Sequence, residues 1–143
     1  MTPADFSILR QSVKNDEGLR LLPYVDSTGN ITIGYGRNLS QNGISQLEAS
    51  DMLDQDLTRH ISDLTRAYPY VNQLDPVRQI VLASMCFNMG LPRLSKFVQM
   101  WDAIQRGDFQ VAASEMLASV WARQVGARAT RLAASMASGE LKG

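Results

Sequence analysis

The sequence predicts an α+β fold, in which a small β-sheet near the N-terminus is followed by helices. Two observations lead to this prediction. Residues 19–36 combine β-branched residues with dense turn signals, which is typical of a hairpin. From residue 45 onward, apolar residues recur every three to four positions, which is the period of a helix. Because so small a sheet is not stable alone, we expect it to pack on helices.

The first predicted element is an amphipathic helix over residues 3–17. Thr2 followed by Pro3 is a typical helix start, and Gly18 is a typical residue at a helix end. Glu17 therefore lies at the C-terminus of the helix, where the helix dipole disfavours a negatively charged carboxylate. Glu17 is a candidate proton donor on this basis, and a solvated glutamate at a helix end is the alternative interpretation.

The next predicted elements are two short strands, at residues 19–25 and 31–33, joined by the turn sequence DSTGN at residues 26–30. The turn begins with Asp26, and Thr32 stands between two isoleucines in the second strand. Together with the glutamate of the first helix, Asp26 gives two carboxylates on neighbouring elements. Acid–base cleavage of a glycosidic bond requires such a pair.

The rest of the chain is predicted to be helical after a loop at residues 38–43. Ser45 and Glu48 form a capping box, which opens an uninterrupted helix over residues 45–67. The helix after Pro76 is the most apolar and is predicted to form the core through Ile80, Val81, Leu82, Met85 and Phe87. Further helical segments are predicted at residues 93–106, 109–118 and 127–138, with a short turn beginning at Trp121.

The composition limits the function classes. The 143 residues are 45% hydrophobic and 20% charged with a formal net charge of zero, which indicates one globular domain and argues against binding nucleic acid. Cys86 lies in an apolar run and is predicted to be an inert buried thiol. His60 has no second histidine or cysteine beside it, so we expect no metal site and no cofactor. No signal peptide or membrane-spanning segment is recognised in the sequence.

One motif is specific enough to name a family. The segment from Glu17 to Gly36 reads E-G-L-R-x-x-x-Y-x-D-x-x-G-x-x-T-x-G-x-G, and it resembles the phage-type (T4-like) lysozyme family. The resemblance continues through FNMG at residues 87–90 and through WARQ at residues 121–124, followed by Arg128. It covers roughly residues 8–140.

The resemblance implies a lysozyme-like architecture within a single catalytic domain over residues 1–143. An N-terminal lobe with the small sheet is expected at about residues 13–44, and a long linking helix at about residues 45–67. The helical lobe is expected at about residues 68–143, with the first helix packing on it. A substrate cleft between the two lobes is also implied.

The resemblance further implies hydrolysis of the β-1,4 bond between N-acetylmuramic acid and N-acetylglucosamine in peptidoglycan. Glu17 matches the general acid of the family, Asp26 the carboxylate that activates water, and Thr32 the hydroxyl that helps to hold this water. Members with this triad invert the anomeric centre. The substrate-binding residues expected from the family pattern are Asn38, Phe87, Asn88, Gln124 and Arg128.

The same pattern implies an ion pair between Arg128 and Glu17, and the chain also departs from it at several positions. Arg37 stands where the family has a histidine, so the stabilising ion pair of that histidine is expected to be absent. Asn38, Met100 and Glu115 replace family residues that contact substrate, and the loop at residues 38–43 is shorter than in the family.

The leading hypothesis is a monomeric phage endolysin whose partner is the glycan strand of peptidoglycan. It is expected to stay in the host cytoplasm, without membrane insertion, until holin lesions release it to the cell wall or periplasm. One alternative is a lytic transglycosylase, although the pair Asp26 and Thr32 favours hydrolysis. The other alternative is a catalytically silent module that binds peptidoglycan or serves in the virion.

Overall fold

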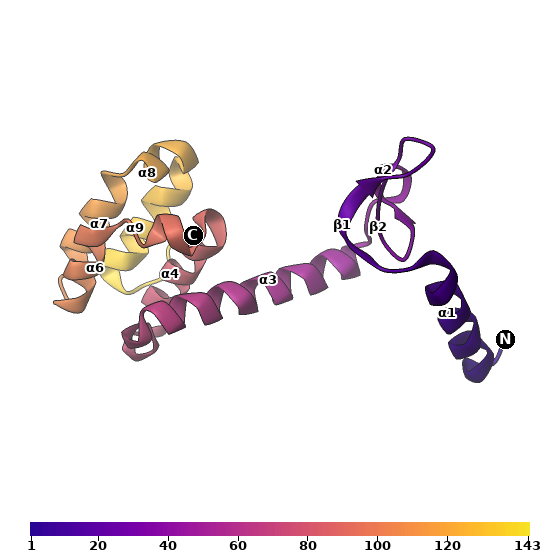
Figure 1. Ribbon diagram of the computed structural model, residues 1–143. Helices are drawn as coiled ribbons and strands as arrows, with labels where there is room; N and C mark the ends of the chain where they lie inside the picture. The colour runs from indigo at the N-terminus through magenta and orange to yellow at the C-terminus, as the bar shows by residue number, and fades with distance from the viewer. The chain divides into compact units, whose positions relative to one another are not determined.

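The computed structural model describes residues 1–143 and divides into two compact units, Met1–Asp51 (unit 1) and Met52–Gly143 (unit 2). Unit 1 contains a helix, a three-stranded sheet and a second, short helix, and unit 2 is helical (Figure 1). Helix α3 (Gln46–Ala67) begins in unit 1 and continues into unit 2. The predicted α+β class is confirmed.

Helix α1 spans Pro3–Glu17, as the sequence predicts. The Thr2 hydroxyl oxygen accepts a hydrogen bond from the backbone N–H of Asp5, and the Asp5 carboxylate accepts one from the backbone N–H of Thr2. This reciprocal pair satisfies two backbone donors at the start of the helix. Gly18 ends the helix at a φ of 69°, a conformation that glycine adopts without strain.

The sheet of unit 1 is antiparallel with the strand order β1-β2-β3, so β2 is its central strand. Thr32 in β2 lies opposite Tyr24 on one side and Asn38 on the other. Its side chain is buried, with a residue exposure of 4%. The strands are β1 (Arg20–Val25), β2 (Ile31–Gly34) and β3 (Arg37–Asn38).

The loop predicted at residues 38–43 is wrong, because Leu39–Asn42 forms the short helix α2. Asn38 caps this helix: its side-chain oxygen accepts a hydrogen bond of 3.0 Å from the backbone N–H of Gln41. The Ser40 hydroxyl then accepts a bond of 2.8 Å from the backbone N–H of Ile31, which ties α2 to strand β2. A helix of a single turn is too short for its apolar residues to show a helical period in the sequence.

An ion pair closes the segment between β3 and α3. Arg37 donates to both carboxylate oxygens of Glu48, at 3.0 and 2.7 Å, and also to the carbonyl oxygen of Gly43 at 3.2 Å. Glu48 also accepts a bond of 2.9 Å from the backbone N–H of Ser45, which confirms the predicted capping box. The hydrogen bonds from Arg37 and then Ser45 lower the pKa of Glu48 to about 2.

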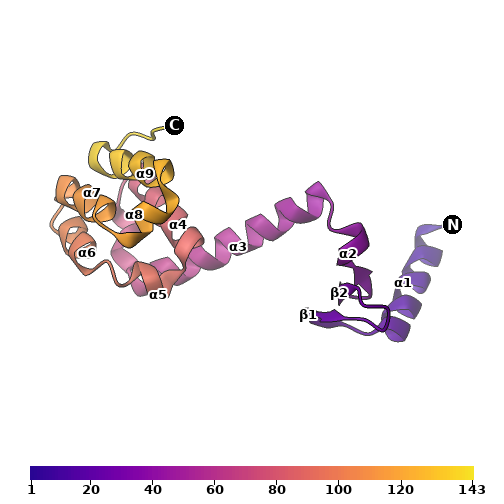
Figure 2. The ribbon, with the colours of Figure 1, turned by 90° about the horizontal axis from the view of Figure 1, so that it is seen from above.

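The helices of unit 2 lie close together in both ribbon views (Figures 1 and 2). Their buried side chains form one hydrophobic core. Helix α7 packs on α6 and α9, and α9 also contacts α4. The largest fully buried side chains include Leu64, Leu82, Met85, Met116 and Met136. The elements after α3 are η1 (Pro69–Gln73), α4 (Pro76–Met89), α5 (Leu91–Leu94), α6 (Val98–Gln105), α7 (Phe109–Leu117), α8 (Val120–Val125) and α9 (Ala127–Ser138).

Two details of the predicted helical part are wrong. Ile80 and Phe87 are 47% and 36% exposed, because the inward face of α4 runs through Val81, Leu82, Met85 and Cys86 instead.

The predicted helix over residues 93–106 is divided into α5 and α6. Between these helices, the indole N–H of Trp101 donates to the carbonyl oxygen of Leu94 at 3.0 Å, which satisfies an acceptor at the end of α5. The Leu94 carbonyl oxygen at this break therefore has a buried hydrogen-bond donor, the Trp101 indole. Trp101 in turn stacks on the ring of Tyr68, at a centroid distance of 3.8 Å.

The Arg37–Glu48 pair predicts a specific dependence of stability on pH. Folding lowers the pKa of Glu48 from its ordinary value of 4.5 to about 2, so its stabilising effect is complete above about pH 4.5 and is lost as the pH falls toward 2. We expect Glu48→Gln to lower the melting temperature at pH 6 and to have a clearly smaller effect at pH 2.5. Thermal melts of both proteins across this range measure the difference, and a gap independent of pH would contradict the assignment.

Candidate active site

The Glu17 carboxylate lies against the backbone of the β2–β3 turn. A Cβ atom placed on Gly36 would lie 2.9 Å from Glu17 Oε2, so a side chain at this position would displace the Glu17 carboxylate. Gly36 also has a φ of 86°, which residues with a side chain rarely adopt. The backbone conformation therefore favours glycine at position 36, and the absence of a side chain there leaves the Glu17 carboxylate in this position.

One further contact joins the end of α1 to this turn, and a second closes the helix itself. The backbone N–H of Gly18 donates to the carbonyl oxygen of Lys14 at 3.1 Å, which closes the last helical turn. The Lys14 ammonium lies 5.2 Å from the centroid of the Tyr35 ring, within the range of a cation–π contact. Lys14 precedes Glu17 by three residues and Tyr35 precedes Gly36 by one. The Lys14–Tyr35 contact therefore lies beside the Glu17–Gly36 contact.

Asp26 begins the turn between β1 and β2, and its carboxylate organises that turn. Asp26 Oδ1 accepts three hydrogen bonds: from the backbone N–H of Thr28 at 2.9 Å, from the Thr28 hydroxyl at 2.8 Å and from the backbone N–H of Asn30 at 2.9 Å. The backbone N–H of Asp26 donates to the carbonyl oxygen of Asn30 at 2.9 Å. All the side-chain bonds of Asp26 end on Oδ1, which leaves Oδ2 available to another donor.

These bonds keep Asp26 ionised. The pKa of Asp26 is lowered from its ordinary value, first by the backbone N–H of Asn30 and then by the Thr28 hydroxyl, with desolvation opposing them. The Thr28 backbone and the Thr32 side chain add smaller effects in the same direction. A carboxylate that is charged and has one free oxygen can accept a proton from water.

Thr32 and Asn38 lie side by side on paired strands. The Thr32 hydroxyl donates to the carbonyl oxygen of Asn30 at 3.2 Å and is also close enough to Asp26 to lower its pKa. Unit 1 thus brings together Asp26 and Thr32 through the turn, and it holds Glu17 against the same sheet. Asn38 lines a surface hollow of about 600 Å³ that also includes Tyr35, Gly36 and the Arg37–Glu48 pair.

The other predicted site residues lie in unit 2. The Asn88 side-chain oxygen accepts a hydrogen bond of 2.7 Å from the indole N–H of Trp121, and the Gln124 oxygen accepts one of 3.0 Å from Arg93. Phe87 meets the His60 ring edge to face, with a centroid distance of 5.7 Å. Arg128 is half-buried in α9. Contact of these side chains with substrate, and the Arg128–Glu17 pair, stay predictions.

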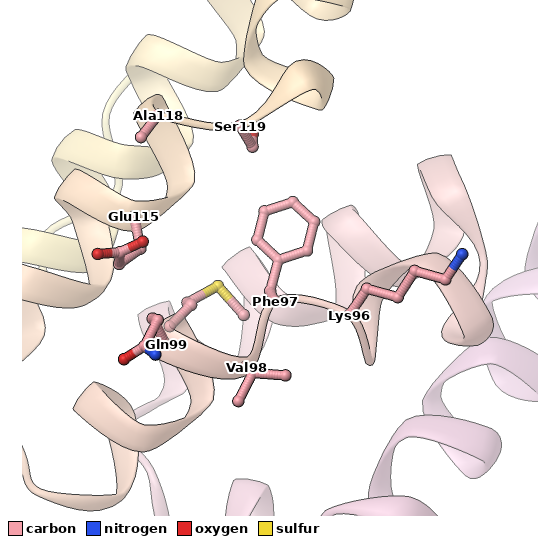
Figure 3. Close-up of a pocket in the computed structure, with 8 residues that line it drawn as sticks. Lys96, Phe97, Val98, Gln99, Glu115, Ala118 and Ser119 are labelled. Carbon is pink, nitrogen blue, oxygen red and sulfur yellow. The ribbon is translucent and has the colours of Figure 1, made fainter.

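A second hollow, of about 290 Å³, lies within unit 2 between the start of α6 and the end of α7. Figure 3 shows the Phe97 ring pointing toward Ser119, while the Lys96 side chain extends away from it. Met100 and Glu115, two of the positions that depart from the family pattern, line this hollow. Met100 is fully buried, so it serves the core of unit 2.

Cys86 lies in unit 2, and groups that could ligate a metal are considered over the whole chain. Cys86 is fully buried, as predicted, and burial is the main cause that raises the pKa of its thiol. Its sulfur lies 3.9 Å from His60 Nδ1. No group of three or more histidine, cysteine, aspartate or glutamate side chains is arranged to hold a metal ion. None of the helices has the length and apolar character needed to cross a bilayer.

The sequence reasoning missed Thr28 and Asn30 as partners of Asp26. The signal was present, because an aspartate followed two residues later by threonine is typical of a turn in which the carboxylate accepts local hydrogen bonds. It also missed the Arg37–Glu48 ion pair, since it weighed Arg37 only as a lost histidine.

Comparison with known proteins supports the motif analysis. A family model described as phage lysozyme matches residues 14–134. The chain is 28% identical to probable T4-type lysozyme 2 of Dictyostelium discoideum, over 95% of this chain and 97% of that protein. It is 26% identical to probable T4-type lysozyme 1 of the same organism, over 94% and 96% of the two chains.

A third relative has a different architecture. The pre-baseplate central spike protein Gp5 of Enterobacteria phage T4 is 28% identical over 94% of this chain, but the match spans only 28% of Gp5. The family match covers the helix end, the hairpin and most of unit 2. The chain belongs to the phage lysozyme family, and its general class of activity is that of a lysozyme-type glycosidase.

Proposed function

We propose that the protein is a muramidase that hydrolyses the β-1,4 bond between N-acetylmuramic acid and N-acetylglucosamine in bacterial peptidoglycan. The observation that carries the proposal is the state of Asp26. Three donors bind Oδ1 and lower the pKa of Asp26, while Oδ2 keeps a free lone pair for water.

In this mechanism Glu17 is the general acid. Its carboxyl group protonates the glycosidic oxygen as the bond to the anomeric carbon breaks, and it becomes a carboxylate. Asp26 removes a proton from a water molecule on the opposite face of the sugar, and the resulting hydroxide adds to the anomeric carbon. Thr32 helps to orient this water. An inverting reaction of this type needs carboxyl groups ~6.5–9.5 Å apart, which leaves room for the water.

The biological role that fits this activity is that of an endolysin. The two Dictyostelium relatives are named as T4-type lysozymes and match over nearly their full lengths. We propose that the protein acts on the glycan strands of peptidoglycan as a monomer, and that it depends on a holin for its passage from the host cytoplasm to the wall.

The match to Gp5 favours a second candidate function. Gp5 is named as a spike protein, so a domain of this family can form part of a phage structural protein. In that case the present chain would bind peptidoglycan as a virion module without cleaving it. A lytic transglycosylase is the third possibility, in which a hydroxyl of the substrate replaces the water.

Glu17→Gln separates these functions. The amide has nearly the same shape and cannot donate the required proton, so we expect activity to fall at least ~10³-fold, with the fold and glycan binding retained. Mass spectrometry of purified peptidoglycan after digestion measures both rate and product. Asp16→Asn, which removes the neighbouring carboxylate, is the matched control and is expected to remain active.

The products decide between the three candidates. Hydrolysis gives muropeptides with a reducing end, whereas anhydromuramyl products would indicate a transglycosylase. Binding without any cleavage by the wild-type protein would indicate the silent module. Cleavage by Glu17→Gln at the wild-type rate would contradict the role of Glu17 as acid.

Gly36 provides a test of the position of Glu17. In Gly36→Ala the new methyl group collides with Glu17 Oε2, so the carboxylate has to move and kcat is expected to fall at least ~10-fold. Gly34→Ala is a matched control, because Gly34 also has a positive φ, of 73°, but has no atom within 4 Å of the added Cβ. Equal losses of kcat in the two variants would mean that backbone strain, and not the displacement of Glu17, is responsible.

A further inference from the structure

The turn between β1 and β2 contains a relay of hydrogen bonds that ends on Asp26. The Asn30 side-chain amide donates to the Thr28 hydroxyl oxygen at 2.9 Å, and the Thr28 hydroxyl donates to Asp26 Oδ1 at 2.8 Å. The backbone N–H groups of Thr28 and Asn30 donate to the same oxygen of Asp26. Thr28 and Asn30 therefore each donate a backbone N–H to the Asp26 carboxylate. Their side chains form a second connection to it, from the Asn30 amide through the Thr28 hydroxyl.

This relay has a fixed direction. A hydroxyl has one proton, and Thr28 donates it to Asp26, because the ionised carboxylate can only accept and the Asn30 NH2 group can only donate. Bonds arranged in such a chain polarise one another, which strengthens the bond to the carboxylate. The side chain of Asp26 cannot rotate without breaking bonds to Oδ1, so the direction of Oδ2 is fixed as well.

We propose that Thr28, supported by Asn30, is a positioning residue for the base of the reaction, because its hydroxyl fixes the rotation of the Asp26 carboxylate and leaves Oδ2 to the water. This inference rests on the proposed function. It adds to it a residue that touches neither substrate nor water. Thr28 thereby has a role separate from that of Thr32, which lies in strand β2 and donates to the carbonyl oxygen of Asn30.

No neighbouring charge competes with this network. The charged residue of β1, Arg20, has its guanidinium over the Tyr24 ring, 4.4 Å from the centroid, and β2 carries no charged residue. Arg37 of β3 is paired with Glu48. The causes that change the pKa of Asp26 are hydrogen bonds and desolvation alone, and the Thr28 hydroxyl is the second largest of them. Removing this hydroxyl is thus expected to raise the pKa of Asp26.

The test compares Thr28→Val, which keeps the shape and loses the hydroxyl, with Thr28→Ser, which keeps the hydroxyl. In Thr28→Val we expect kcat for purified peptidoglycan to fall about tenfold, the order expected for one hydrogen bond to a charged group, with KM within about twofold. The acidic limb of the pH profile of kcat should move to higher pH, because Asp26 then needs a higher pH to ionise. Thr28→Ser should recover most of the lost kcat and the wild-type limb.

Two controls make the result decisive. Ser27→Ala changes the same turn at a residue that makes no hydrogen bond to Asp26, and it is expected to leave kcat and the pH profile unchanged. The titration of the Asp26 side-chain carboxyl, followed by ¹³C NMR, measures the network independently of activity and should move upward in Thr28→Val. Thr28→Ala provides a second variant without the hydroxyl, and circular dichroism checks the fold of each.

The possible failures are distinguishable. An unchanged Asp26 titration and an unchanged acidic limb in Thr28→Val, beside an active wild-type protein, would overturn the positioning role alone. A loss of kcat that Thr28→Ser does not recover would also overturn it, since the hydroxyl would not be the cause. A wild-type protein that releases no glycan products would overturn the proposed function and the positioning role of Thr28 together.

Discussion

The contact between the Glu17 carboxylate and the backbone at Gly36 is the constraint on which the site of unit 1 depends. It brings the end of a helix to the turn of a sheet, at a distance where a side chain at residue 36 would displace the carboxylate. The sheet also carries Thr32 in its central strand and Asp26 at the end of its first hairpin. One close approach therefore relates the proposed acid to the element that presents the proposed base.

The two carboxylates of unit 1 stand in different surroundings. Asp26 is bound by three donors, which hold it ionised, whereas no hydrogen bond within unit 1 reaches the side chain of Glu17. A pair of acids can divide the roles of proton donor and acceptor only when their environments differ. The local hydrogen bonds of the DSTGN turn supply this difference. The different environments of Glu17 and Asp26 therefore arise from the five residues of this turn.

Much of the fold could be predicted because its signals are local. The start and end of α1, the two hairpin strands and the Ser45–Glu48 capping box each follow from residues within a few positions of one another. The short helix α2 and the break between α5 and α6 could not be predicted from local signals. They are accompanied by individual contacts that apolar spacing does not reveal, such as the bond from the Trp101 indole to the Leu94 carbonyl oxygen. The exposure of Ile80 and Phe87 depends on which face of an apolar helix turns inward, and only tertiary packing decides this.

The candidate site shows the same division. The spacing of glutamate, aspartate and threonine with their glycines was enough to name the family, which the comparisons confirm. The Gly36 contact and the Thr28 relay were not predicted, since the first brings together residues far apart in sequence and the second depends on the direction of a hydroxyl. Arg37 illustrates the limit of family reasoning. Arg37 forms an ion pair of its own, in which both terminal nitrogens of the guanidinium donate to the Glu48 carboxylate.

The anomeric configuration of the newly released sugar tests the central claim most directly. Cleavage of a β-1,4 bond by an acid and a base on opposite faces must give the α-anomer first. Proton NMR of a peptidoglycan fragment during its first minutes of digestion, before mutarotation, can observe it. We expect the α-anomer to accumulate first. Initial release of the β-anomer, or of a product with no reducing end, would contradict the roles assigned to Glu17 and Asp26.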